Sequence, residues 1–262
     1  MNRRLDWAEK RATEFDNVDP QKSIAILPTA AIEQHGPHLP VGTDTMIMQG
    51  MLKRLKQQCP DDLDLYILPI QAVGKSNEHL WARGTLTLTA QDALSVWTDI
   101  GLSVARSGFR KIVIVNSHGG NLDLISILSR ELRVRAAMLA VKCQWGSFGH
   151  PESLYTEGEL KYGIHGGDVE TSLMLAFNPE CVDMSKAKDF RSAAETSAIS
   201  PIGPISRGWI ASDLNADGTV GNASLGTAEK GEATANHQVA GFIELLRQVV
   251  EAELPTAPAQ LL

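Results

Sequence analysis

The sequence predicts an α/β fold, a three-layer α/β/α sandwich with a mainly parallel central sheet. Short apolar runs alternate along the chain with longer segments of helical periodicity, which is the order expected of parallel strands with helices on both faces. The clearest strand, residues 111–116, has a β-branched, continuously apolar centre, as in a strand covered on both sides. Polar loops follow two of the strands, and in such sheets ligands bind where the carboxyl ends of the strands converge.

Each expected element rests on a local pattern. Residues 23–27 form a short apolar run that Pro28 ends, and from Asp44 onward apolar side chains recur with helical spacing. Gly108 follows a segment with the length and periodicity of a helix. We expect strands at residues 23–27, 65–70, 111–116 and 137–144, and helices that begin at Asp44 and span 90–107, 122–132, 169–177 and 229–253.

Residues 183–227 differ in composition from the rest of the chain. They are rich in Ser, Ala, Gly, Pro and Asp and show little periodicity, which predicts a long irregular excursion over the surface or across a subunit boundary. The helix expected after this segment should return to the same core. Residues 1–262 are therefore predicted to form a single domain.

Charge and composition narrow the class of function. A formal net charge of −7 and a pI near 5.5 do not provide the basic surface that nucleic acid or an anionic membrane requires, so small-molecule chemistry is favoured. The three cysteines are widely spaced and form no CxxC pair, which fits a reducing cytoplasm. A charged N-terminal stretch and the lack of any run of about 18 apolar residues argue against secretion and membrane insertion.

The loop after the first strand concentrates groups that bind metals. Glu33 and His35 lie two residues apart, a spacing that in extended backbone sends both side chains to one side. Asp44 begins the next helix, where it could bridge two divalent ions or serve merely as a helix cap. The density of His and Glu favours the metal interpretation. His38 follows Pro37 and is expected to support the site or to be structural.

Two further loops carry candidate groups. His118 follows the clearest strand and precedes Gly119 and Gly120, whose small size lets backbone approach a ligand. Two alternative roles for this loop are a helix cap and a phosphate-binding loop. The second is disfavoured, because the Walker lysine and the three-glycine dinucleotide pattern are both missing. His165 precedes a helix that has Glu170 in its first turn, where an acidic residue can also be only a partner of the helix dipole. His165 is a candidate acid for protonating a leaving nitrogen.

Other polar residues are candidates for substrate contact. The residues that could line a pocket are Ser76, Glu78, His79 and Trp145, and Trp145 could equally be a core or interface aromatic. Ser117 is excluded as a nucleophile, because Asn-Ser-His-Gly-Gly is not the Gly-x-Ser-x-Gly elbow.

These motifs resemble the creatininase family, also called the creatinine amidohydrolase family. The resemblance is carried by four segments in chain order, residues 27–44, 116–121, 165–172 and 226–231. It implies an α/β/α sandwich, a two-metal site of zinc or manganese, hydrolysis of cyclic amides or formamides, and often a hexameric homo-oligomer. By position it implies metal ligands at Glu33, His35, Asp44, His118 and Glu170, with Asp44 bridging, proton transfer by His165, and a pocket tryptophan at Trp145. We also predict a catalytic role for Glu170 and substrate contacts at Ser76, His79 and Gly119.

The sequence also departs from the family. Creatininase has a Tyr and a Glu after the histidine that corresponds to His118, where this chain has Gly119 and Gly120, so a metal-linked carboxylate and a substrate contact are missing. We therefore expect a member other than creatininase itself. Ala82-Arg83-Gly84-Thr85 replaces the usual Phe-Pro-Gly-Thr, and Arg83 either meets an anionic substrate or is simply solvated.

The expected function is that of a metal-dependent amidohydrolase. It would use metal-activated water to cleave a C–N bond in a small cyclic amide such as a lactam, a cyclic urea or a creatinine-like ring. A formamide deformylase or a peptide-processing amidase on the same site is the alternative within enzymes. Outside enzymes, the alternatives are a non-catalytic metal-binding assembly protein and a plain nucleotide-binding α/β protein.

Overall fold

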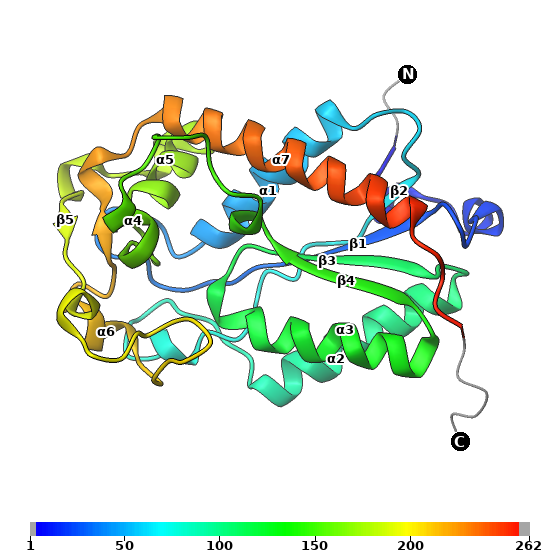
Figure 1. Cartoon of the computed structure of the whole chain (residues 1–262), viewed down its shortest axis with the longest axis horizontal. Helices are drawn as coiled ribbons and strands as arrows, with labels where there is room; N and C mark the ends of the chain where they lie inside the picture. Colours follow the sequence, from blue (N-terminus) through cyan, green and yellow to red (C-terminus); the bar gives the residue numbers. More distant parts are fainter. Residues whose placement is uncertain (1–3, 257–262) are drawn as a thin grey trace.

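The computed structural model describes residues 4–256 and contains a four-stranded parallel sheet in the order β2-β1-β3-β4 (Figure 1). The strands are β1 (Ile24–Thr29), β2 (Leu65–Ile67), β3 (Lys111–Asn116) and β4 (Leu139–Gln144). Every residue of the two central strands, β1 and β3, is buried, which accounts for their continuous apolar sequences. The predicted α/β fold with a mainly parallel sheet is confirmed.

Helices cover both faces of this sheet. The helices α1 (Thr43–Gln58), α5 (Asp168–Phe177) and α7 (Ala228–Glu251) pack on one face, and α2 (Ala90–Arg106) and α3 (Leu122–Ala136) pack on the other (Figure 1). Alternate residues of each central strand enter opposite cores. In β1, Ile24 and Ile26 belong to the core beneath α1, α5 and α7, whereas Ala25 and Leu27 belong to the core beneath α2 and α3.

The strand register aligns the carboxyl ends of three strands. Thr29 at the end of β1 pairs with Asn116 at the end of β3, and Asn116 pairs with Gln144 at the end of β4. The loops that leave these three residues begin at one edge of the sheet. Parallel pairing thereby brings together polar loops that are about ninety residues apart in sequence.

Lys111 lies at the opposite end of the sheet, at the start of β3. It is fully buried, and its Nζ donates to the carbonyl oxygens of Val250 at 2.7 Å and Ala252 at 2.9 Å. These carbonyls lie at the C-terminal end of α7, where the last turn leaves acceptors without helical partners and the helix dipole favours a cation. Lys111 therefore fastens the longest helix to the central strand.

The observed elements differ from the predicted ones mainly at their ends. The strand expected at 65–70 ends at Ile67, because Pro69 has no N–H to donate, although Gln71 donates to Pro28 and so keeps the segment beside β1. The strand expected from residue 137 begins at Leu139, because Ala137 adopts a left-handed conformation (φ 51°) that ends α3. The sequence did not predict the short helix α4 (Glu157–Tyr162).

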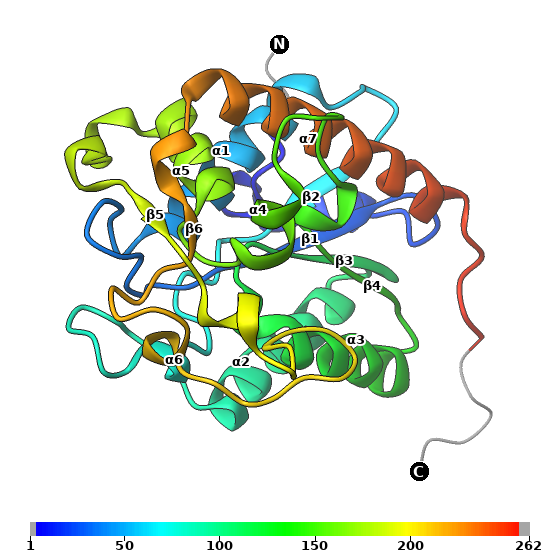
Figure 2. The same cartoon turned by 60° about the vertical axis from the view of Figure 1, so that its left-hand side comes forward.

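The segment 183–227 contains only short elements. It includes the helix α6 (Ala211–Leu214) and a two-stranded antiparallel ladder of β5 (Asp189–Phe190) and β6 (Gly221–Asn222) (Figure 2). The end of this segment lies beside the loop before α5, where the Val220 N–H donates to the carbonyl oxygen of His165 at 2.8 Å. Among residues 4–256, no helix has the length and apolar character needed to cross a membrane.

Candidate metal centre

Five side chains that the sequence predicts as metal ligands meet at the carboxyl edge of the sheet. They come from the loop after β1, the first turn of α1, the loop after β3 and the first turn of α5. These residues are Glu33, His35, Asp44, His118 and Glu170. Four of them are buried, and Glu170 is the most open, with 24% of its side chain exposed.

Asp44 lies between two sets of these groups. Its Oδ2 is 3.3 Å from Nδ1 of His118, and the same Nδ1 is 3.2 Å from Oε1 of Glu33. Its Oδ1 is 3.6 Å from Nε2 of His35, and that Nε2 is also 3.6 Å from Oε2 of Glu170. Each carboxylate oxygen of Asp44 thus faces a different histidine.

Backbone carbonyls orient both of these histidines. Nδ1 of His35 is 3.0 Å from the carbonyl oxygen of Glu33, and Nε2 of His118 is 2.9 Å from that of Lys75. A carbonyl can only accept, so each of these nitrogens carries the proton. In the neutral ring the other nitrogen then has a free lone pair directed at the carboxylates, which is the arrangement that usually supports a metal-binding histidine.

The residues present fit a divalent cation. Nε2 of His35 and Oδ2 of Asp44 are buried, and neither has a hydrogen-bond partner in the described part of the chain. Buried polar atoms left unpaired cost free energy, and a cation would satisfy both. Imidazole nitrogens together with carboxylate oxygens are donors that Zn²⁺ and Mn²⁺ accept.

The electrostatics of the cluster support the same conclusion. Burial by itself lowers the pKa of His35, but the negative charge of Asp44, 3.6 Å away, outweighs burial and raises that pKa to about 10. Burial also lowers the pKa of His118, but the negative charge of Glu33 outweighs burial and raises that pKa well above its ordinary value. Without a cation, protons on these imidazoles balance the buried carboxylates. A metal would replace those protons as the source of positive charge.

The pKa values of Glu33 and Glu170 are shifted in opposite directions. Burial raises the pKa of Glu33, but the positive charge of His118 outweighs it and holds that pKa well below its usual range. Burial raises the pKa of Glu170 to about 7, although the charge of His35 opposes this shift. Glu33 is therefore ionised at neutral pH, and Glu170 is poised to gain or lose a proton there.

His165, predicted from sequence to be catalytic, lies directly against this cluster. Its ring centroid is 4.2 Å from that of His35, and its Nδ1 is 3.5 Å from Oε1 of Glu33. Its Nε2 lies 2.7 Å from the carbonyl oxygen of Gln34 and so carries the proton. Burial, reinforced by the charge of His35, holds the pKa of His165 well below its ordinary value. The ring is thus neutral, with the lone pair of Nδ1 facing the cluster.

The segment after β2 adds two groups that the sequence assigned to substrate contact. Ser76 Oγ donates to Oε2 of Glu33 at 2.5 Å, and His79 Nε2 is 3.5 Å from Oε1 of the same carboxylate. Both side chains are buried. The structure therefore brings Ser76 and His79 to the cluster, on the side of Glu33, and their contact with a substrate stays a prediction.

The remaining predicted residues are Trp145, Gly119 and Arg83. Trp145 follows β4 but packs in the core, with its ring centroid 5.0 Å from that of Phe242, and its indole N–H has no hydrogen-bond partner in the described structure. Gly119 is exposed, and a Cβ there would have no neighbour within 4 Å. Arg83 is exposed as well. A role for these residues in substrate binding stays a prediction.

Gly120 has a packing role that the sequence did not reveal. A Cβ at this position would lie 2.2 Å from Oε1 of Glu78 and 2.4 Å from Nε2 of His118. The buried carboxylate of Glu78 takes up this space, with Oε2 2.7 Å from Nζ of Lys75 and Oε1 3.6 Å from Nε2 of His118. The missing side chain at position 120 thus makes room for a carboxylate supplied by another segment.

A second buried carboxylate, Glu159 in α4, holds the start of α5. It accepts from the N–H of Asp168 at 2.7 Å and from the N–H of Asn222 at 2.9 Å. A Cβ at Gly163 or Gly167 would lie within 2.3 Å of its oxygens. Glu159 fixes the turn from which Glu170 projects. Its sequence context, a charged segment followed by a lone glycine, gives no sign of this role.

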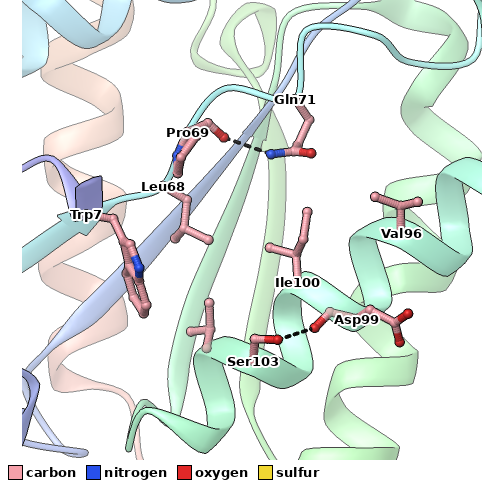
Figure 3. A pocket seen from close by; sticks show the side chains of 9 residues that line it. Trp7, Leu68, Pro69, Gln71, Val96, Asp99, Ile100 and Ser103 are labelled. Atoms are coloured by element: carbon pink, nitrogen blue, oxygen red, sulfur yellow. Dashed lines mark hydrogen bonds between the residues drawn. The ribbon is translucent and has the colours of Figure 1, made fainter. Parts of the chain in front are cut away.

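A separate apolar pocket of about 500 Å³ lies between β2 and α2 (Figure 3). The side chains that line it are Trp7, Leu68, Pro69, Gln71, Val96, Asp99, Ile100, Ser103 and Val104. It contains none of the clustered histidines, and its one carboxylate, Asp99, is exposed. The chemistry of the molecule is therefore placed at the metal-binding cluster.

Comparison with known proteins agrees with this geometry. The family profile described as creatinine amidohydrolase matches residues 8–246. The creatinine amidohydrolase of Pseudomonas putida is 29% identical over 93% of this chain and 95% of its own length. The mycofactocin precursor peptide peptidase of Mycolicibacterium smegmatis is 26% identical over 86% of this chain and 85% of its own length.

Solved structures share the fold. A putative creatinine amidohydrolase from Bacteroides fragilis superposes with a TM-score of 0.78 at 24% identity, covering 98% of this chain and all of that one. Two further creatininases, each with a TM-score of 0.72, are a manganese form and a mutant of Zn–Zn type. The chain therefore belongs to the creatininase family, whose members are metal-dependent hydrolases that act on C–N bonds.

Proposed function

We propose that this protein is an amidohydrolase that uses two divalent cations, Zn²⁺ or Mn²⁺, to hydrolyse the C–N bond of a small cyclic amide. The observation that carries the proposal is the position of Asp44, whose two buried oxygens face two different histidines. A carboxylate between two sets of ligands is how a bridging residue is arranged in a two-metal site. Creatininases similar to this chain include a manganese form and a Zn–Zn form.

The ligands divide into two sets that share Asp44. Glu33 and His118 accompany its Oδ2, and His35 and Glu170 accompany its Oδ1. Each set would offer one imidazole nitrogen and carboxylate oxygens to one cation. Bound cations would lower the pKa of a coordinated water to about 7 and polarise the carbonyl group of the substrate.

We propose His165 and Glu170 as the catalytic residues, with His165 transferring the protons. The Nδ1 lone pair of His165 can take the proton of the attacking water and return it to the departing nitrogen as the C–N bond breaks, while its Nε2–H stays on the carbonyl of Gln34. Glu170 is the only one of the five ligands with substantial exposure, so it lies on the side from which a substrate can approach.

A small cyclic amide is the proposed substrate class, and a lactam or cyclic urea is favoured over creatinine because position 120 carries no carboxylate. A peptide-processing amidase is the second candidate. It is favoured by the similarity to the mycofactocin precursor peptide peptidase and by the exposure of Gly119, where an added Cβ would have no neighbour within 4 Å.

Removal of the metals should abolish hydrolysis. Dialysis of the purified protein against a chelator should lower amide hydrolysis to background and lower the melting temperature, because ligands that bind only the folded state stabilise it by about 2.7 kcal/mol at a hundredfold excess over Kd. Zn²⁺ or Mn²⁺ should restore both, and Mg²⁺ added at the same concentration is the control. Full activity in protein shown by elemental analysis to be metal-free would refute the mechanism.

Substitution of Asp44 and of His165 should have different effects. Asp44→Ala should lower the metal content toward zero, because it removes a ligand from both sets. His165→Ala should keep the metal content of the wild type and slow turnover by about 10²- to 10⁴-fold, the usual contribution of a general acid or base. Asp123→Ala is the matched control, since Asp123 is an exposed aspartate in the first turn of α3. Loss of metal from His165→Ala would instead make His165 a ligand.

A substrate panel separates the candidate functions. Lactams, cyclic ureas, creatinine, formamides and short peptides should be offered to the zinc- and manganese-loaded protein, with release of amine or acid measured for each. We expect a cyclic amide to have the highest kcat/KM. Preference for peptides would establish the second candidate, and two bound metals without hydrolysis of any compound would indicate a metal-binding protein without catalytic activity.

We also propose that the protein assembles into a homo-oligomer through the segment 183–227. Several isoleucines of this segment are exposed, among them Ile199 at 52%, Ile205 at 84% and Ile210 at 44%. Light scattering on the purified protein should give a mass of two or more times the 28.4 kDa of one chain. Ile205→Glu should shift it toward the monomer, and a monomeric wild-type protein would overturn the proposal.

A further inference from the structure

Two backbone groups orient the side-chain amide of Gln34. Its Oε1 accepts from the backbone N–H of Gly36 at 2.9 Å, and its Nε2 donates to the carbonyl oxygen of Gly218. If the amide were turned over, two donors would meet at Gly36 and two acceptors at Gly218. Two backbone groups from segments far apart in sequence therefore decide which end of the amide carries the hydrogens.

This orientation fixes the proton on His79. Nδ1 of His79 is 2.8 Å from Nε2 of Gln34, and because Gln34 donates at that end, the imidazole nitrogen must accept. A ring that accepts through Nδ1 is neutral and carries its hydrogen on Nε2. That N–H is buried, and its nitrogen lies 3.5 Å from Oε1 of Glu33.

His165 has the opposite arrangement in the same place. Its Nε2 lies 2.7 Å from the carbonyl oxygen of Gln34, which can only accept, so Nε2 carries the hydrogen. Nε2 of Gln34 is also 3.2 Å from this nitrogen, but the two hydrogens of the amide are directed at Gly218 and His79, so this contact is not a hydrogen bond. The Nδ1 lone pair of His165 faces Oε1 of Glu33. The rings of His79 and His165 lie side by side, with centroids 4.4 Å apart. One residue, Gln34, therefore gives these two histidines different roles, through its side chain for His79 and through its backbone for His165.

The distinction matters because Glu33, His79 and His165 lie close enough together to hold a metal ion. A nitrogen that carries hydrogen cannot coordinate a cation, so His79 is unavailable as a ligand while Gln34 keeps its orientation. Its N–H can instead donate to the carboxylate of Glu33. Such support of a ligand by an outer partner typically contributes about 10- to 100-fold to metal affinity or activity.

We propose that Gln34 is a positioning residue that holds His79 as an Nε2–H donor to Glu33, so that His79 orients a ligand of the metal centre and is kept from becoming a ligand itself. The inference rests on the proposed function only in taking Glu33 as a ligand. The proton position on His79 does not depend on hydrolysis, and it can be measured whether or not any substrate is found.

Nitrogen NMR of the imidazole rings tests the proton position directly. Protein labelled with ¹⁵N should be examined metal-free and loaded with Zn²⁺, with His79 assigned from the spectrum of His79→Leu. We expect the Nε2–H tautomer of His79 in both states. The Nδ1–H tautomer, or a zinc-induced shift that marks Nε2 as coordinated, would overturn the proposal.

Two variants test the role of Gln34. Gln34→Glu replaces the donor by an acceptor and should move the hydrogen of His79 to Nδ1. Gln34→Met removes the donor without adding charge and should leave His79 in a mixture of tautomers, which keeps the test available if the buried carboxylate prevents folding. Gln21→Glu, on an exposed side chain, is the control for charge. An unchanged tautomer in a folded Gln34 variant would show that Gln34 does not set it.

The effect on the metal centre is measured by zinc titration. His79→Leu should bind the same number of zinc ions per chain as the wild type, with affinity lower by about 10- to 100-fold. Loss of one ion per chain would show that His79 is a ligand. Unchanged affinity and stoichiometry would show that His79 does not support Glu33.

Discussion

The centre of this molecule depends on compensating several buried charges in one small space. Asp44 and Glu33 are removed from water, and carboxylates in that position persist only when positive charge or hydrogen-bond donors lie against them. In the chain alone, protonated imidazoles of His35 and His118 supply that charge, as their raised pKa values show. A pair of divalent cations would supply it more completely and would also satisfy the unpaired atoms of His35 and Asp44.

The fold brings these groups together and holds them in place. Parallel pairing aligns the ends of β1, β3 and β4, so the loop bearing Glu33 and His35 and the loop bearing His118 leave the sheet side by side. The helices α1 and α5 then point their first turns at the same place, where carboxylates are favoured by the helix dipoles. Asp44 and Glu170 occupy those turns.

A second layer of residues keeps the first in a single arrangement. Backbone carbonyls set the ring orientation of His35 and His118, Ser76 donates to Glu33, and Glu159 ties the start of α5 to the ladder that closes the segment 183–227. Glycines at the crowded positions admit these contacts, most clearly at Gly120, where Glu78 fills the space. The specificity of the site therefore lies as much in these supports as in the ligands.

The sequence by itself determined the class of fold and the family, because strand patterns and the spacing of Glu33, His35 and Asp44 are local properties of the chain. It also selected the five side chains that meet at the sheet edge. Only the tertiary structure decided which oxygen of Asp44 faces which histidine, that Trp145 packs in the core, and that Gln34 and Glu159 support the site. It also showed that Glu78 fills the space left by Gly120. Most of these features depend on contacts between segments far apart in the chain, such as the 184 residues between Gln34 and Gly218, and no local pattern encodes them.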